Sequence, residues 1–157
     1  MAKTLDEMLR CAKASVGSLT AEEAKGLAGS PEVIFIDVRE TSELRRTGRI
    51  PDAIHVTRGM LEFRTDPESP YHKAEIDRSK MIVVVCATGQ RSLLAARTLR
   101  EMGFDNVRNL AGGMNAWKAA GGATERPGVS LLKDLTVGIL SVGVSTLRRA
   151  WVAFNGT

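Results

Sequence analysis

The chain has few cysteines and histidines among its 157 residues, and each shortage excludes a class of function. The two cysteines, Cys11 and Cys86, form no Cys-x-x-Cys pair, which argues against a zinc site, a dithiol redox centre or a disulfide scaffold. The two histidines, His55 and His72, are expected at the surface or in turns, which disfavours a cysteine–histidine hydrolase. We therefore expect no metal, no cofactor and reduced cysteines.

Aromatic residues and clustered charge are also scarce. Aromatic residues make up 4% of the chain, and a net charge of +4 is spread along it without a basic cluster. Nucleic-acid binding is therefore not expected, whereas small anionic ligands would be favoured. Residues 1–14 lack the continuous apolar core of a signal peptide. We predict a cytoplasmic protein built mainly from one domain.

Apolar strand-like runs alternate with helix-like segments along most of the chain. Expected strands cover 33–36, 54–56, 81–85 and the segment around 107–110, and expected helices cover 4–14, 20–28, 41–47, 92–102 and 114–120. Thr20 and Glu23 have the spacing of a capping box. The polar segment 58–80 is expected to be loop with one helical turn. This alternation predicts an α/β fold with parallel pairing, which places Asp37 and Cys86 at the same carboxyl edge of the sheet.

The loop that follows the strand at 81–85 contains the residues best suited to chemistry, "VVVCATGQRS". A glycine-containing loop before a helix can point backbone N–H groups inward, and that arrangement binds anions and favours a thiolate. Arg91 adds a positive charge, which we expect to face this loop. Two interpretations of Cys86 stay open at this point, a nucleophile and a small buried hydrophobic residue.

Three segments occur in an order that resembles the rhodanese family of sulfurtransferases. They are "IDVRETSELRRTGRIPDAIHV", "VVVCATGQRS" and "NLAGGMNAWKAAG", and the resemblance covers residues 18–122. It implies a central, mainly parallel sheet with helices on both faces. It also implies that Cys86 takes a sulfane sulfur from thiosulfate or a persulfide and passes it to a thiol or cyanide-like acceptor. The residues implied to bind the substrate are Ala87, Thr88, Gly89, Gln90, Arg91 and Ser92.

The length and charge of the loop distinguish this chain from related enzymes. Four residues separate Cys86 from Arg91, whereas the similar cell-cycle phosphatases and arsenate reductases have five, so a phosphatase is the less favoured alternative. Many rhodaneses carry basic residues where this chain has Ala87 and Thr88. That departure favours a low-molecular-weight or protein persulfide over thiosulfate as the donor. Rhodanese-like modules without activity usually lack the cysteine, which disfavours a purely regulatory module here.

Asp37 and Arg39 match the family's "DVR" segment, and two interpretations apply to them. They could organise the rim of the active site. Alternatively, an ion pair such as Arg39 with Glu43 could fix the turn between strand and helix.

Two extensions flank the family-like region, a helical one at 1–17 and a second at 123–157. In the second, the segment 135–147 is uncharged but shorter than the roughly 20 residues that a bilayer span needs. Its apolar residues recur at helical spacing: Leu140, Val144, Leu147, Trp151 and Phe154. This stripe could pack on the domain, form a homo-oligomer or partner contact, or, least favoured, lie on a membrane.

Overall fold

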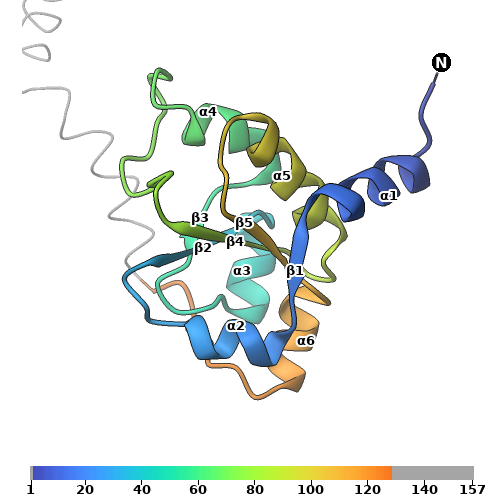
Figure 1. Ribbon diagram of the computed structural model, residues 1–157. Coiled ribbons are helices and arrows are strands. Elements are labelled where there is room, and N and C mark those ends of the chain that lie inside the picture. The colour runs from blue at the N-terminus through green and yellow to red at the C-terminus, as the bar shows by residue number, and fades with distance from the viewer. Residues whose placement is uncertain (1, 129–157) are drawn as a thin grey trace, which may run out of the picture. The chain divides into compact units, whose positions relative to one another are not determined.

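Figure 1 shows a sheet with helices on both faces, in a computed structural model that describes residues 2–128. The elements are α1 (Leu5–Ser15), β1 (Gly17–Leu19), α2 (Ala21–Leu27), β2 (Val33–Asp37), α3 (Thr41–Thr47), β3 (Ile54–His55), the 3-10 helix η1 (Arg58–Met60), α4 (Leu61–Thr65), β4 (Met81–Val85), α5 (Gln90–Glu101), β5 (Val107–Leu110) and α6 (Gly113–Ala119).

The five strands form one parallel sheet in the order β1-β5-β4-β2-β3. β4 occupies the centre, and its residues from Ile82 to Val85 are fully buried, as expected for a strand covered on both faces. In the register, Asp37 lies beside Val85 and Asn109 beside Val84. Because Cys86 follows Val85, these residues share the carboxyl edge of the sheet. The predicted parallel α/β fold is confirmed.

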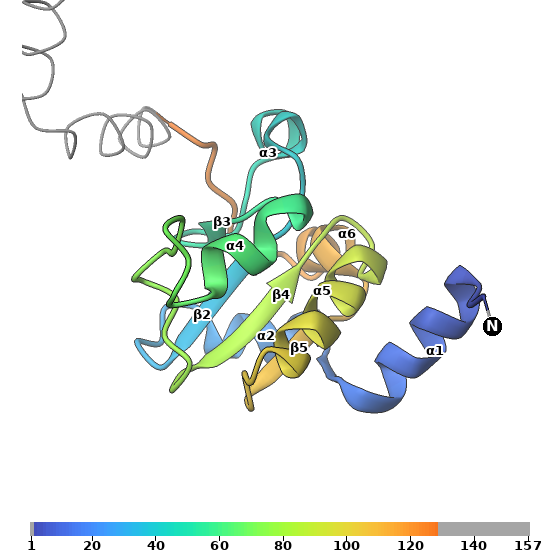
Figure 2. The ribbon, with the colours of Figure 1, turned by 90° about the horizontal axis from the view of Figure 1, so that it is seen from above.

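Two apolar cores lie on the two faces of the sheet. One face carries α1, α4 and α5, and its core includes Ala12, Leu61 and Leu99. The other carries α2, α3 and α6, and its core is centred on Trp117, whose ring meets Phe35 edge-on at 6.0 Å between centroids. Figure 2, seen from above, shows α1 beside α5 and α4 over β2 and β4. The helices thus hold the carboxyl end of β4 between two packed layers.

Most predicted elements are present, with three differences. The capping box of Thr20 and Glu23 is confirmed, with the Glu23 N–H donating to Thr20 Oγ1 at 3.2 Å. The strand β1 was missed, since Gly17 was expected only to end the first helix. α5 begins at Gln90, two residues before the expected start at 92. The segment 58–80 contains two short helices, η1 and α4, rather than one turn.

Both expected extensions touch the rest of the fold where the structure describes them. Residues 2–126 belong to one compact unit, and the expected boundary between 17 and 18 falls inside β1. Beyond 122, Trp117 Nε1 donates to the Ala123 carbonyl at 2.9 Å, and Arg49 and Glu125 pair through their backbones.

The apolar stripe at 140–154 lies outside the described residues, so its predicted oligomer contact stays a prediction. Among residues 2–128, no helix is both long and apolar enough to cross a bilayer. The cytoplasmic location likewise stays a prediction.

Candidate active site

Cys86 lies fully buried at the end of β4, and the loop after it turns back over its sulfur. The Gly89 N–H donates to Cys86 Sγ at 3.1 Å, and Ser92 Oγ lies 3.2 Å from the same atom. Gly89 has a φ of 95°, and a Cβ there would lie 3.0 Å from the backbone nitrogen of Gly112. Glycine is therefore required for this loop to close against the β5–α6 connection.

The surroundings of Cys86 favour its thiolate. Burial of the side chain raises the pKa of the thiol, but hydrogen bonds oppose this effect. They come from the Ser92 hydroxyl and from the backbone N–H groups of Ser92, Gly89 and Thr88, and together they bring the pKa of Cys86 below its ordinary value. α5 begins at Gln90 and carries no acidic residue in its first turn, so the positive end of its dipole adds to this effect.

Asn109, which the sequence analysis did not single out, completes this network from the end of β5. Only 4% of the residue is exposed. Its Oδ1 lies 2.7 Å from Ser92 Oγ, and its Nδ2 donates to the Gly89 carbonyl at 3.2 Å. Its place near the carboxyl end of an expected strand, the edge of the sheet where Asp37 and Cys86 were also expected, was the available signal in the sequence.

Arg91 forms an ion pair with Glu43 of α3. Its Nη1 and Nη2 donate to the two carboxylate oxygens of Glu43 at 2.8 and 2.7 Å. The hydrogen bond from Arg91 is the main reason that the pKa of Glu43 falls to about 2. The positive charge of Arg91, which was expected to face the loop, is therefore neutralised by an acid 48 positions earlier in the chain.

Asp37 and Arg39 form a second ion pair at the end of β2, and both side chains are buried. Arg39 Nη2 lies 2.7 Å from Asp37 Oδ2, and Arg39 also donates to Thr47 Oγ1 and to the Gly48 carbonyl, each at 2.8 Å. The ion pair suggested between Arg39 and Glu43 is wrong, because each takes another partner. The buried pair instead links the C-terminal end of α3, at Thr47 and Gly48, to the end of β2.

Residues 20–120 match the sequence model of the rhodanese-like domain. The chain belongs to the rhodanese-like family. Among curated relatives, it is 32% identical over 95 residues to a protein of Allochromatium vinosum named "Sulfurtransferase". That match covers 60% of this chain and 80% of the relative. It is also 32% identical over 104 residues to YrkF of Bacillus subtilis, matching 66% of this chain but only 51% of the length of YrkF.

A solved structure from Rhodopseudomonas palustris is similar over a larger part of the chain. Its sequence is 41% identical, it superposes with a TM-score of 0.76, and the match covers 80% of this chain and 96% of that one. That protein is described as of unknown function and as a possible tyrosine phosphatase.

The rhodanese-like loop borders a cleft that α1, outside the matched residues, helps to build. The cleft has a volume of about 380 Å³ and includes Thr88, Gly89 and Gln90 from the loop. α1 contributes Leu9 and three charged residues, Asp6, Arg10 and Lys13. A volume of this size suits a small ligand. A helix predicted as an extension therefore lines a hollow beside the loop of Cys86.

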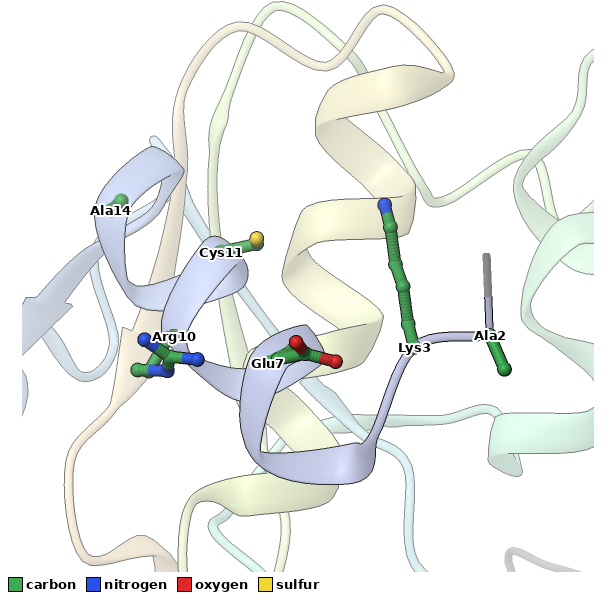
Figure 3. A pocket seen from close by; sticks show the side chains of 6 residues that line it. All are labelled: Ala2, Lys3, Glu7, Arg10, Cys11 and Ala14. Carbon is green, nitrogen blue, oxygen red and sulfur yellow. The ribbon is translucent and has the colours of Figure 1, made fainter.

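Cys11 lies on α1 and is exposed. It lines a different hollow of about 530 Å³, where Figure 3 shows it on the same helix as Glu7 and Ala14. Only Arg10 is common to this hollow and the cleft beside the loop. Residues 2–128 contain no group of three or more His, Cys, Asp or Glu side chains that could hold a metal ion.

Proposed function

We propose that this rhodanese-like protein is a sulfurtransferase that carries sulfane sulfur on Cys86 as a persulfide. The observation that carries the proposal is the convergence of the Gly89 N–H and the Ser92 hydroxyl on a buried Sγ. Such donors stabilise negative charge on sulfur without a metal or a histidine base. Membership of the family and the name of the Allochromatium vinosum relative support the same class of reaction.

The reaction needs two displacements at sulfur. In the first, the Cys86 thiolate attacks the sulfane sulfur of the donor, the donor's sulfur–sulfur bond breaks, and the rest of the donor leaves with the bonding electrons. Thiosulfate would release sulfite, and a persulfide would release a thiolate. In the second, an acceptor thiolate or cyanide attacks the outer sulfur, and Cys86 leaves as a thiolate. The loop residues from Ala87 to Ser92 would surround the outer sulfur, with Gly89 and Ser92 nearest to Sγ.

A persulfide is the donor that this loop favours. Ala87 and Thr88 carry no charge, and Glu43 neutralises Arg91. The loop therefore offers little compensation for thiosulfate, a dianion, whereas a persulfide brings less negative charge. The donor would be a low-molecular-weight persulfide or a protein persulfide. The neighbouring cleft, lined by Asp6, Arg10 and Lys13 among others, offers room for the organic part of such a partner.

Intact-mass measurement after incubation with thiosulfate, or with a low-molecular-weight persulfide, tests the proposal. We expect the wild type to gain one sulfur atom. Cys11→Ser should gain the sulfur atom like the wild type, whereas Cys86→Ser should not. No gain with either donor would contradict the proposal. Hydrolysis of an aryl phosphate that depends on Cys86 would instead favour the phosphatase description of the Rhodopseudomonas palustris neighbour.

A further inference from the structure

The buried amide of Asn109 contacts Ser92 and Gly89, two residues that donate hydrogen bonds to Cys86 Sγ. On one side its Oδ1 meets the Ser92 hydroxyl at 2.7 Å, and on the other its Nδ2 donates to the carbonyl of Gly89 at 3.2 Å. The second bond fixes the orientation of the amide, because reversing it would place two acceptors, Asn109 Oδ1 and the Gly89 carbonyl, against each other. Asn109 Oδ1 is therefore an acceptor held against Ser92.

Ser92 has one hydroxyl proton and two neighbours that could accept it. Oδ1 of Asn109 is 2.7 Å away, and Sγ of Cys86 is 3.2 Å away. The amide oxygen can only accept, so the contact with Asn109 requires Ser92 to donate. When it donates there, its lone pairs face Sγ, and they suit a protonated thiol but not a thiolate.

We propose that Asn109 is a positioning residue that competes with Cys86 Sγ for the single hydroxyl proton of Ser92. This rests on the proposed sulfur transfer and adds a residue to it. While Cys86 is a thiol or a persulfide, Sγ is a weak acceptor and Ser92 donates to Asn109. When the outer sulfur leaves and Cys86 becomes a thiolate, the Ser92 hydroxyl rotates and donates to Sγ. The proton stays on Ser92 throughout, and no bond to Asn109 forms or breaks.

The charged groups near Cys86 include two ion pairs, and Glu40 also lies near enough to act on Arg91. Arg91 of α5 is paired with Glu43 of α3, and Arg39 is paired with Asp37, the last residue of β2. On the side of β1, the charged residues that border the neighbouring cleft come from α1, and they are Asp6, Arg10 and Lys13. Substitutions at Asn109 and Ser92 leave all of these in place, so a change in the titration of Cys86 reports on the hydroxyl.

The test is titration of the Cys86 thiolate by its ultraviolet absorbance, in a Cys11→Ser background so that one thiol is observed. Asn109→Leu removes the competing acceptor while keeping a similar volume, and the Gly89 carbonyl still accepts from the Leu93 N–H. We expect this variant to lower the pKa of Cys86 by about half a unit, a roughly threefold rise in the thiolate-to-thiol ratio. Ser92→Ala should raise the pKa.

The double variant Asn109→Leu/Ser92→Ala should titrate like Ser92→Ala alone, since Asn109 acts only through that hydroxyl. If Asn109→Leu raises the pKa as Ser92→Ala does, Asn109 merely holds the loop together and the proposal fails. If Asn109→Leu does not fold, Asn109→Met, an unbranched side chain and only a weak acceptor, carries the same prediction.

Intact mass separates this proposal from the proposed function. A wild type that gains no sulfur would overturn the sulfur-transfer role, whereas the titrations would still decide whether Asn109 competes for the proton. If the wild type gains sulfur but the pKa of Cys86 does not fall in Asn109→Leu, only the role proposed for Asn109 is overturned.

Discussion

Two arginines near the carboxyl edge of the sheet are each paired with an acid, but their environments differ. Arg39 is 2% exposed and its partner Asp37 1%, and the pair lies within one turn of chain. Arg91 is 43% exposed and Glu43 20%, and that pair joins α5 to α3. The buried pair fixes the turn after β2. The exposed pair lies next to the cysteine loop, where a substrate could compete for either partner.

The largest effect is expected from breaking the buried pair. Arg39→Met should reduce the free energy of unfolding by roughly 3–5 kcal/mol, because Asp37 would remain buried without a positively charged partner. Arg97→Met is the matched control, since Arg97 forms an exposed pair with Glu101 four positions along the same helix, and its loss should cost less than about 0.5 kcal/mol. Chemical denaturation measures both. Equal losses would show that the burial of Arg39 does not matter.

The exposed pair should instead affect the choice of donor. Glu43→Gln leaves the charge of Arg91 unpaired, and this charge then attracts the dianion thiosulfate. We therefore expect thiosulfate to transfer sulfur to Cys86 several-fold faster. Arg91→Gln leaves Glu43 unpaired beside the loop and should slow the same reaction. The measurement is the initial rate of sulfur gain by intact mass. Rates that change in the same direction would show that the pair serves only to hold the loop.

The smallest effect is a dependence of stability on pH. The pKa of Glu43 falls from 4.5 to about 2 on folding, so its pair contributes fully above pH 4.5 and the contribution is lost as the pH falls towards 2. The difference in unfolding free energy between wild type and Glu43→Gln should therefore shrink across this range. Denaturation at pH 7 and pH 3 checks it. A difference that grows on acidification would show that the pair with Arg91 does not lower the pKa of Glu43.

Local patterns in the sequence were enough to predict the layers of the fold. Strands with apolar runs and helices with apolar periodicity are encoded by neighbouring residues, as is the capping box of Thr20. β1 was missed because Gly17 and Ser18 carry no apolar signal, and the strand exists only by pairing with β5. The edge position of Asp37 and Cys86 followed from the alternation of strands and helices.

The candidate site was predictable only in part, because its remaining contacts join distant parts of the chain. The motif pointed to Cys86 and the loop after it, and their roles stay predictions. The partner of Arg91 is 48 positions away, and the bond from Asn109 to Gly89 spans 20. Such contacts depend on the order of the strands in the sheet, which no short motif contains. The suggested pair of Arg39 and Glu43 was wrong because Glu43 pairs with the distant Arg91, whereas Arg39 pairs with its near neighbour Asp37.

The central claim is that Cys86 carries sulfur between two substrates, and a single-turnover transfer measures it most directly. The protein is loaded with a donor whose sulfane sulfur is radiolabelled, freed of excess donor, and mixed with a thiol acceptor. We predict that one equivalent of label passes to the acceptor and that Cys86 returns to its unmodified mass. Label that never binds, or that stays on the protein when the acceptor is added, would contradict this account.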